Sequence, residues 1–394
     1  MSRILSSSSP LLTDLFKAYE DARRHKRKTK GTLEFSLNYE ERLFELYEDL
    51  VCRRYKIAPA TCFIVTKPVR REIFAGDFRD RIVHHLIFNY LNPLCERLFT
   101  NDSYACRKGK GTSYGIKRAD HFIRSVSHNY TRDCYVLQLD ISGYFMSINR
   151  TILYEKVTRI IERYRDEITF DTELVLWLLE KIIFHDHIKA CIQCGDTSNW
   201  TELPSSKSLF HAAPGCGLPI GNLTSQLFGN VYLNDFDHFA MRLVPGVRCG
   251  RYVDDMIFVH QDKEVLRQII LKVQYFLSEK LALTLHPRKI KLTHYEQGID
   301  FLGARMFRGR MYPRRPIVTN VERTIMQWNE VLQVNDVLTE AEVQKLLASI
   351  NASLGHLAFF QTRRLRQCLL ARCMPAFLRH VQCDKSFRTL ARMW

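Results

Sequence analysis

The sequence has 394 residues, of which 46% are hydrophobic and 11% aromatic, a composition that excludes a disordered chain and is large enough for two or three subdomains. No apolar run reaches the roughly 18 residues of a membrane span, and the apolar stretch at the N-terminus is too short for a secretory signal. We therefore expect a cytoplasmic protein without a membrane partner, whose 12 cysteines are thiols. Lysine and arginine outnumber aspartate and glutamate by 58 to 42, so the net charge of +16 favours a polyanionic partner, nucleic acid before anionic lipid.

The first third of the chain predicts helices followed by a basic hairpin. Apolar spacing favours a helix opening at Pro10 and another over 39–55, and then two strands, formed by 63–65 and the segment 67–74 and joined by a basic turn. The turn between these strands carries Lys67, Arg70 and Arg71, which would hold a triphosphate by charge and by bidentate guanidinium contacts. An ordinary basic hairpin is the alternative.

A glycine-spaced basic loop follows over 103–112. It carries Arg107, Lys108 and Lys110 but lacks the Gly-Lys-Ser/Thr ending of a nucleotide-binding P-loop. We interpret it as a loop that lies against a nucleic-acid backbone.

Residues 136–141 predict a strand that ends in the carboxylate of Asp140, before a tight turn and a helix from Arg150. A strand end of this kind suits a metal ligand, and the carbonyl of Ile141 would add another oxygen. The ring of Phe145, beneath the sugar, would exclude a 2′-hydroxyl and so select deoxynucleotides. Packing in the core is the alternative for Phe145.

An inserted segment between 170 and 210 contains His185, His187, Cys191 and Cys194, residue types that bind zinc. Only three residues separate His187 from Cys191, so the four do not match a finger pattern, and a surface insertion with reduced thiols is the alternative. A Gly/Pro loop over 214–222 then precedes a helix expected over 223–241. Small residues in that loop allow close approach of a ligand to the backbone, although a flexible surface turn has the same composition.

Two adjacent carboxylates, Asp254 and Asp255, stand between strands expected over 247–252 and 256–260. Their mutual repulsion favours a bound cation, and a hard divalent ion such as Mg²⁺ takes such oxygen ligands. A solvated acidic turn is the alternative.

The remaining chain is predicted to form a helix over 265–281, a strand near Lys289 and then a basic helical domain from Thr319. Between 305 and 394 there are 15 lysines and arginines against 6 acidic residues, and Arg363, Arg364 and Arg366 are candidates for phosphate contacts. A helical bundle with a solvated basic face is the alternative.

Together, Asp140, Asp254 and a basic groove predict a two-metal phosphoryl transfer. One metal would lower the pKa of a 3′-hydroxyl, and the other would neutralise the triphosphate and the leaving pyrophosphate. Lys289 would serve as a general acid near the leaving group, unless it is a plain surface lysine.

The ordered series from Asp140 through the glycine-rich loop and Tyr-Val-Asp-Asp to the Lys289 strand and Phe301-Leu302-Gly303 resembles the palm motifs of reverse transcriptases. The resemblance runs from Phe35 to Leu370 and implies a right-hand α+β polymerase fold. Its parts would be N-terminal helices and fingers (1–135), a palm with an antiparallel sheet (136–318) that includes an inserted segment (165–212), and a basic helical thumb (319–394).

This resemblance also implies roles for individual residues. Asp140, Asp254 and Asp255 would be catalytic, and with Ile141 they would bind two Mg²⁺ ions, for which Mn²⁺ would substitute. The implied dNTP site comprises Lys67, Arg70, Arg71, Tyr144, Phe145, Ile220, Gly221, Gln226 and Lys289. The implied primer and template contacts are Arg107, Lys108, Lys110, Tyr252, Phe301, Leu302, Gly303, Arg363, Arg364 and Arg366.

A finer resemblance is to the reverse transcriptases of diversity-generating retroelements. It is carried by segments 67–74, 78–85, 103–112 and 217–226, and by Leu354-Gly355-His356. Most reverse transcriptases look like Gln-Gly-x-x-x-Ser-Pro in the fourth segment, whereas Ile220 stands here at the Gln position and Gln226 at the Pro position. Isoleucine cannot hydrogen-bond to a nucleotide, so we expect error-prone copying.

In that family a template RNA is copied into cDNA with errors at template adenines, with a small basic accessory protein as partner, in bacteria or phages. Bacterial defence reverse transcriptases share much of the pattern, and a retron-type enzyme would usually look different at Ile220 and Gln226. A non-catalytic RNA-binding scaffold is the alternative of another class, and the intact Asp140, Asp254 and Asp255 argue against it.

Overall fold

The computed structural model describes residues 9–24, 26–66, 69–196, 198–334, 338–373, 375 and 380–392. The chain divides into two compact units that alternate along the sequence. Unit 1 comprises 1–108, 138–258 and 264–291, and unit 2 comprises 109–137, 259–263 and 292–394. This division does not follow the predicted fingers, palm and thumb boundaries, which stay a prediction.

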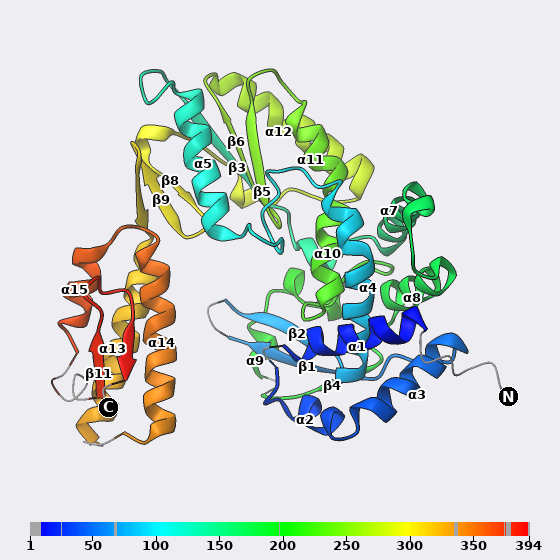
Figure 1. The fold of residues 1–394 in the computed structure, drawn as a ribbon. Coiled ribbons are helices and arrows are strands. Elements are labelled where there is room, and N and C mark those ends of the chain that lie inside the picture. Colours follow the sequence, from blue (N-terminus) through cyan, green and yellow to red (C-terminus); the bar gives the residue numbers. More distant parts are fainter. Residues whose placement is uncertain are drawn as a thin grey trace. The chain divides into compact units, whose positions relative to one another are not determined.

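Most helices of the described chain belong to unit 1 (Figure 1). They are α1 (Pro10–Arg23), α2 (Lys30–Leu37), α3 (Tyr39–Val51), α4 (Phe78–Glu96), α6 (Tyr144–Ser147), α7 (Arg150–Arg163), α8 (Thr172–Phe184), α9 (Ser198–Thr201), α10 (Leu223–Tyr232), α11 (Asn234–Met241) and α12 (Lys263–Leu281). Short 3₁₀ turns lie at Arg165–Glu167, Ser205–Lys207, Leu209–His211, Pro287–Lys289 and Tyr295–Gln297. The helix expected over 223–241 is two helices, because the chain leaves helical hydrogen bonding at Leu233 between α10 and α11.

A three-stranded sheet of unit 1 has the order β2-β1-β4. Its strands are β1 (Ala60–Val65), β2 (Arg71–Ala75) and β4 (Cys191–Gln193). β1 and β2 form the predicted antiparallel hairpin, with Val65 opposite Arg71, and β4 adds in parallel with Ala60 opposite Cys191. The tip residues Lys67 and Pro68 lie outside the described residues.

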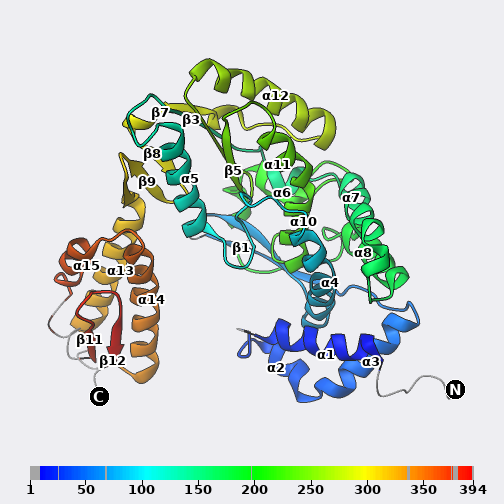
Figure 2. The same cartoon turned by 45° about the horizontal axis from the view of Figure 1, so that its top comes forward.

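A four-stranded sheet has the order β5-β6-β3-β7, formed by β3 (Tyr135–Leu139), β5 (Arg248–Tyr252), β6 (Asp255–His260) and β7 (Lys291–His294). The strands predicted around Asp140 and around the Asp254-Asp255 pair are therefore confirmed. β6 and β3 are neighbours, and the side chains of Asp255 and Asp140 are hydrogen-bonded, so the end of β3 and the start of β6 lie together. α11 and α12 run beside the strands (Figure 2). α12 buries Leu266, Ile269, Val273, Leu277 and Leu281, spaced at helical period, so its amphipathic pattern is satisfied.

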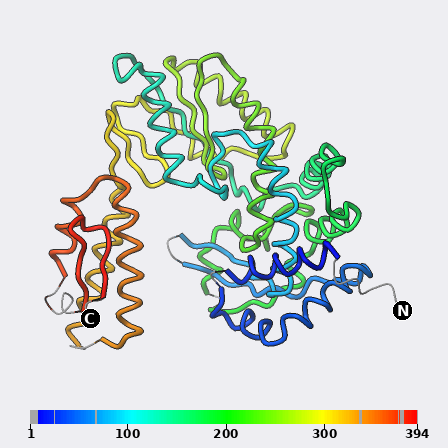
Figure 3. The backbone as a smooth tube through the Cα atoms, viewed as in Figure 1, coloured from blue at the N-terminus to red at the C-terminus, as the bar shows by residue number. Residues whose placement is uncertain are grey.

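Unit 2 contains α5 (Thr112–Val126), a β10-β9-β8 sheet and a C-terminal helical group. The strands are β8 (Ile299–Phe301), β9 (Ala304–Phe307) and β10 (Arg310–Pro313). Figure 3 shows α5 running beside β8 and β9, although about 180 residues separate them in sequence, an arrangement in which the Tyr295 hydroxyl donates to the Tyr130 carbonyl at 3.3 Å. The last elements are α13 (Arg315–Val334), α14 (Glu340–Ala358), α15 (Arg363–Leu370), β11 (Val381–Cys383) and β12 (Leu390–Arg392).

The C-terminal helices have their own apolar core. Leu346, Ile350, Leu354 and Leu357 of α14 are fully buried against Val321 and Ile325 of α13. A complete capping box at Thr339 and Glu342 satisfies the first amides of α14. No helix within the described ranges combines the length and the apolarity that a bilayer crossing requires.

Candidate active site

The Asp254-Asp255 pair lies at the tip of the β5–β6 hairpin. Only Val253 and Asp254 stand between the two strands, so the turn is tight. Val253 has φ of +56°, a left-handed conformation that a β-branched residue rarely adopts. Strain of this kind persists only when the surrounding structure imposes it.

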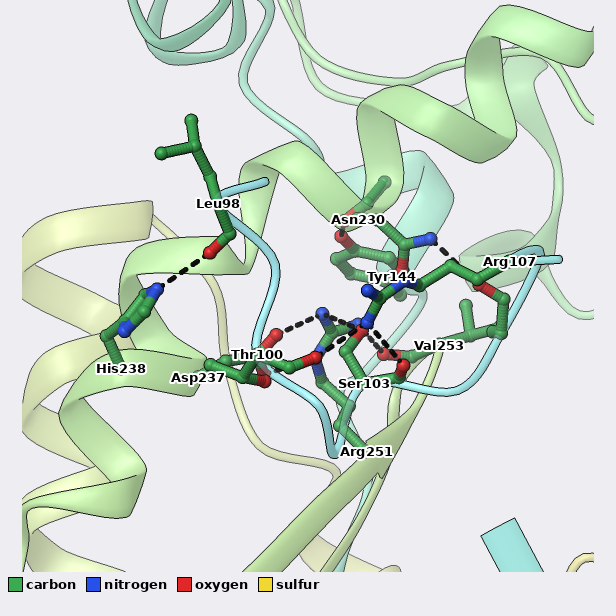
Figure 4. A network of polar contacts seen from close by, with 12 residues as sticks. Leu98, Thr100, Ser103, Arg107, Tyr144, Asn230, Asp237, His238, Arg251 and Val253 are labelled. Carbon is green, nitrogen blue, oxygen red and sulfur yellow. Dashed lines mark hydrogen bonds and ion pairs between the residues drawn. The ribbon is translucent and has the colours of Figure 1, made fainter. Parts of the chain in front are cut away.

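The side chain of Arg251 holds the turn in this left-handed conformation (Figure 4). Its guanidinium is 2% exposed and donates to both carboxylate oxygens of Asp237 on α11, at 2.6 Å each. Nη1 donates to the carbonyl of Val253 at 2.8 Å, and Nη2 to the hydroxyl of Ser103 at 3.2 Å. The backbone of Arg251 also pairs with that of Asp102 and Tyr104, at 2.8 and 2.9 Å. The turn that presents the two acids is thus attached to a helix and to a loop.

Asp140 follows β3 and is buried. Its carbonyl accepts from the amide of His286 at 2.8 Å, and the amide of Ser142 donates to Thr284 at 2.9 Å, so the segment around buried Ile141 is held on both sides. The Lys289 ammonium donates to Oδ2 of Asp140 at 2.7 Å. The predicted general acid therefore lies against the predicted metal ligand.

The three carboxylates act on one another electrostatically. Burial and the charge of Asp140 raise the pKa of Asp254. Burial, with the charges of Asp254 and Asp140, raises the pKa of Asp255 to about 7, although part of its side chain reaches solvent. Burial opposes ionisation of Lys289, but its hydrogen bond to Asp140 and the surrounding acids raise its pKa overall. A site of this charge favours a cation.

Carboxylate oxygens are the donors that Mg²⁺ prefers, so the residue types fit the predicted ion. Within the described parts of the chain, no three histidine, cysteine or acidic side chains converge into a ready-made metal cluster. Asp140 is instead engaged with Lys289, which is about half exposed and could turn away. Metal binding at these carboxylates therefore stays a prediction.

The basic hairpin supplies one arginine to this site. The charge of Arg71, at the start of β2, lowers the pKa of Asp254 and of Tyr252 against the opposing effect of burial. Arg70 instead donates to the carbonyl of Asn199 at 3.1 Å and forms an ion pair with Glu202. Of the three predicted triphosphate ligands, the structure thus brings Arg71 to the carboxylates, engages Arg70 elsewhere and does not describe Lys67.

Tyr144 and Phe145 lie against α10. The buried hydroxyl of Tyr144 donates to the carbonyl of Gly229 at 2.5 Å, and burial raises the pKa of Tyr144 well above its usual range. The Phe145 ring passes over Gly229 and packs, partly buried, against the cluster that includes Phe74 and Leu209. Packing accounts for part of the Phe145 ring, and its role as a sugar gate stays a prediction.

The glycine-rich loop is joined to the β1–β2 hairpin. The amide of Phe74 donates to the carbonyl of Ile220 at 2.8 Å, and the side chain of Ile220 packs, partly buried, on the same apolar cluster. Gly221 has φ of +137°, and a Cβ there would collide with the carbonyl oxygen of Phe74. Gln226 is exposed on α10. The loop is therefore a fixed element rather than a flexible surface turn.

The predicted primer and template residues fall into two groups. In unit 1, Arg107 is turned inward, with an ion pair to Glu96 at 2.8 Å and bonds to the carbonyls of Thr100 and Ser103. Lys108 and Tyr252 also belong to unit 1, and the charge of Asp255 raises the pKa of Tyr252 in addition to burial. A phosphate contact of Arg107 would require these internal bonds to break.

The second group belongs to unit 2. Phe301 is buried, and Leu302 and Gly303 form the β8–β9 turn with φ of +48° and +85°. Arg366 is 3% exposed and donates to the carbonyls of Phe387 and Ser386 at 2.7 and 3.0 Å, which fixes the chain between β11 and β12. The other members are Lys110, which lies over the Tyr114 ring, and the exposed Arg363 and Arg364.

The zinc interpretation of the inserted segment is not supported. No metal-binding group is found within the described residues, which include His185, His187, Cys191 and Cys194. Both cysteines are free thiols, and Cys191 instead opens β4 at the edge of the β1 sheet. The inserted segment therefore extends the β1–β2 sheet by one strand, a role that its sequence did not indicate.

Sequence reasoning missed the residues that hold these parts in place. Arg251 lies in β5 and Asp237 in α11, and neither short element has a pattern that singles out its charged residue. The buried carboxylate of Glu72 was likewise missed: it accepts from the Leu209 amide at 2.7 Å, the Ser208 hydroxyl at 2.8 Å and the Trp200 indole at 3.1 Å. Glu72 thereby attaches the inserted segment to β2.

Carboxylates at neighbouring strand ends, with a lysine bonded to one of them and the charge of an arginine acting on another, form the kind of site that phosphoryl-transfer enzymes use. Comparison with known proteins identifies the class more narrowly. The family model described as reverse transcriptase (RNA-dependent DNA polymerase) matches residues 66–306, more than half of the chain. The protein belongs to the reverse transcriptase family, whose members are RNA-directed DNA polymerases, and the predicted α+β polymerase fold is confirmed.

Individual relatives are more distant. Protein YkfC of Escherichia coli K12 is 25% identical over 299 residues, which cover 67% of this chain and 71% of YkfC. Among solved structures, apo telomerase from Candida tropicalis, truncated from its C-terminal domain, is 12% identical with a TM-score of 0.47 over 68% of this chain. Telomerase from Candida albicans, in complex with a fragment of telomeric RNA, is 11% identical with a TM-score of 0.44 over 84%. The chain spans 59% of the length of each of these telomerase chains.

Proposed function

We propose that this protein copies a template RNA into cDNA by nucleotidyl transfer, as the reverse transcriptase of a diversity-generating retroelement in the cytoplasm of a bacterium. The observation that carries the polymerase activity is the convergence of Asp140, Asp254 and Asp255 with Lys289 and Arg71. The family match supports the reaction class. The retroelement role rests on the sequence of the glycine-rich loop and on the resemblance described above.

The three carboxylates would hold two Mg²⁺ ions, or Mn²⁺ in their place, which supply activation of a primer 3′-hydroxyl and charge neutralisation at the triphosphate. The other tasks belong to the chain itself. The charge of Arg71 acts on Asp254 and lowers its pKa, and this arginine would bind the phosphates of the incoming dNTP. Lys289 carries a proton beside Asp140 and would give it to the pyrophosphate leaving group.

Low fidelity follows from the position of Ile220. Its backbone is bonded to Phe74, and its side chain lies on an apolar cluster, so it presents no hydrogen-bonding group to a base or sugar. A glutamine at this position would place a donor and an acceptor at the nucleotide. Checking of base-pair geometry would then be stricter. We expect errors opposite template adenines, as in the retroelement family, and a small basic accessory protein as partner.

Primer extension on an RNA template with Mg²⁺ and dNTPs tests the reaction. Asp254→Ala should abolish extension, whereas Glu279→Gln, which removes an exposed acid of α12, should extend like the wild type. Full extension by Asp254→Ala would refute the assigned site. Wild type should also be assayed with the accessory protein and the native RNA, and inactivity under those conditions would favour a scaffold.

Sequencing of the products tests the fidelity proposal. Ile220→Gln should lower the misincorporation rate, and Ile220→Leu, which keeps the side chain apolar, should leave it at the wild-type value. Equal misincorporation rates in all three proteins would refute the proposal that Ile220 lowers fidelity. Errors spread evenly over the four template bases would favour a defence or retron enzyme over diversification.

A further inference from the structure

A cavity of about 580 Å³ opens on unit 1 between α7 and α11, and none of its lining residues belongs to the predicted catalytic, dNTP or primer and template sets. α7 contributes Lys156, Arg159 and Arg163, which share one helix face through their spacing of three and four residues. α11 contributes Asp235 and His238, which are three residues apart, and Arg242 follows at its C-terminal end. Two facing helical stripes therefore form the walls.

The lining is strongly cationic. Four of its side chains are lysine or arginine, and Asp235 is the single carboxylate. Asp235 is already paired with Lys156, so it neutralises one charge and leaves the three arginines. Arg159, Arg163 and Arg242 are exposed, and the described residues show no ion pair for any of them. Unneutralised guanidinium groups around a cavity favour a ligand with phosphate groups.

A second cavity of about 520 Å³ adjoins the first, since Phe239 and Arg242 line both. Its other residues include Lys272, Leu271 and Tyr275 of α12. Leu271 and Tyr275 are 68% and 69% exposed, high values for apolar and aromatic side chains. The cationic cavity thus continues into a surface where an aromatic ring faces solvent.

We propose that α7, α11 and α12 form a second binding surface, for single-stranded nucleic acid, separate from the catalytic carboxylates. The arginines would bind backbone phosphates, and Tyr275 would stack on an unpaired base. Guanidinium groups beside an exposed aromatic ring suit a nucleotide chain better than an acidic protein, which offers carboxylates but no base. The strand would be either the template RNA beyond the copied segment or the released cDNA.

Fluorescence anisotropy of the full chain with labelled oligonucleotides of one sequence, as RNA and as DNA, tests the proposal. The variant is Arg159→Gln/Arg163→Gln/Arg242→Gln. The control, Lys189→Gln/Arg267→Gln/Lys280→Gln, removes three exposed charges of the same unit that line neither cavity. Loss of three phosphate contacts should weaken binding about tenfold at 0.1 M salt and reduce the slope of log K against log salt by about 2. The control should change the affinity and slope much less.

The outcomes separate the sources of the strand. A loss confined to RNA supports the template, a loss confined to DNA supports the cDNA, and a loss with both supports a shared path. Equal affinities and slopes in the variant and the control would overturn the proposal. So would an unchanged affinity for RNA and DNA together with lost binding of polyglutamate, since the surface would then be a protein-docking face.

Two further measurements make the result specific. Cross-linking of RNA that carries 5-iodouridine should label the tryptic peptide 273–280, which contains Tyr275, and the arginine variant should reduce this label. Label elsewhere but not on this peptide would contradict the assigned surface. Extension of a short duplex by one nucleotide should be unchanged in the variant. Because the binding assays need no catalysis, failure of the proposed polymerase activity would be seen separately from failure of this site.

Discussion

The carboxylate of Asp237 holds the guanidinium of Arg251 by two hydrogen bonds of 2.6 Å, and Arg251 in turn holds the carbonyl of Val253 at 2.8 Å. The catalytic turn therefore rests on a buried ion pair between a strand and α11. Since Val253 has a left-handed backbone, the turn needs such an external bond to keep its conformation. Arg251 is a positioning residue, which acts through the backbone that carries Asp254 and Asp255.

Arg251→Lys should slow extension by about 100-fold, because a lysine keeps the charge but cannot bond Asp237, Ser103 and Val253 together, and a misplacement of about 1 Å can have that effect. Asp237→Asn, which leaves the guanidinium buried without its partner charge, should lower the free energy of unfolding by about 3–5 kcal/mol. Extension rates well below the melting temperature and urea unfolding measure the two effects.

The matched control is Arg97→Gln. Arg97 also forms two hydrogen bonds with one carboxylate, that of Glu167, but both partners are about half exposed. Its loss should change the free energy of unfolding far less than Asp237→Asn does, because solvent screens an exposed ion pair. If Arg251→Lys retained wild-type extension, the positioning role of Arg251 would be refuted.

Gly221→Ala should destabilise unit 1 and slow extension. An alanine Cβ would meet the carbonyl of Phe74, which is backbone and cannot move aside, and φ of +137° adds strain of about 1–3 kcal/mol. Gly355→Ala on α14 is the control, because a Cβ there meets nothing within 4 Å and alanine favours the helix. Chemical denaturation should show a loss for the first variant and none for the second; equal stability of both would contradict the role of Gly221.

Asp255→Asn should stabilise the metal-free protein at pH 8. Folding raises the pKa of Asp255 from 3.8 to about 7. Between pH 3.8 and pH 7, Asp255 therefore keeps a proton in the folded protein that it has lost in the unfolded chain. The free energy of unfolding therefore falls as the pH rises from 3.8 to 7, and this fall does not occur with asparagine, which does not ionise. Because Asp255 is partly exposed, we expect a discounted effect of about 1 kcal/mol.

Thermal melting in EDTA should show the higher melting temperature of Asp255→Asn at pH 8, with a smaller difference at pH 5. Mg²⁺ should raise the melting temperature of the wild type more than that of the variant, since the cation relieves the same repulsion. A variant less stable than wild type at pH 8 would show that Asp255 is not held against its neighbours.

The sequence predicts a site residue when a pattern of neighbouring residues marks it, and fails when the contact joins residues far apart in the chain. Asp140, Asp254 and Asp255 are predictable because each stands at the end of a short apolar run, and a strand end is a local pattern. The bond between Arg251 and Asp237 spans 14 positions and that between Arg251 and Ser103 spans 148, and no periodicity connects them. Arg251 therefore lay within the strand predicted over 247–252, directly before the Tyr-Val-Asp-Asp motif, and had no assigned role.

Burial and strand pairing account for the other differences. Arg107 and Arg366 were predicted to contact nucleic acid because sequence gives their charge but not the internal carbonyls that bind them. β4 has three residues and is defined by its partner β1, more than a hundred positions away, so the cysteines within it suggested a metal instead. The break between α10 and α11 falls at Leu233, where neither proline nor glycine stands, and apolar spacing continues through it.

Two buried histidines predict acid sensitivity. His84 is bonded to the hydroxyl of Thr224 at 2.8 Å, and burial, with neighbouring positive charges, lowers its pKa to about 3. Burial, with His185 and His84 nearby, likewise lowers the pKa of His187 to about 3. Below pH 6.5 the unfolded chain takes up protons that the folded protein refuses, so stability falls as pH drops from 6.5 towards 3. At pH 5.5 each histidine should contribute a loss of about 1.4 kcal/mol.

His187→Phe isolates one of these contributions, because the ring already packs edge-on against Phe74 at 6.2 Å and phenylalanine keeps that packing. Urea unfolding at pH 7.5 and 5.5 should show a pH-dependent loss about 1.4 kcal/mol smaller in this variant than in the wild type, whatever its stability at pH 7.5. His211→Phe, at an exposed position, should retain the wild-type loss. If the loss of unfolding free energy between pH 7.5 and pH 5.5 were the same in His187→Phe as in the wild type, His187 would be protonated in the folded protein and would not be buried as described.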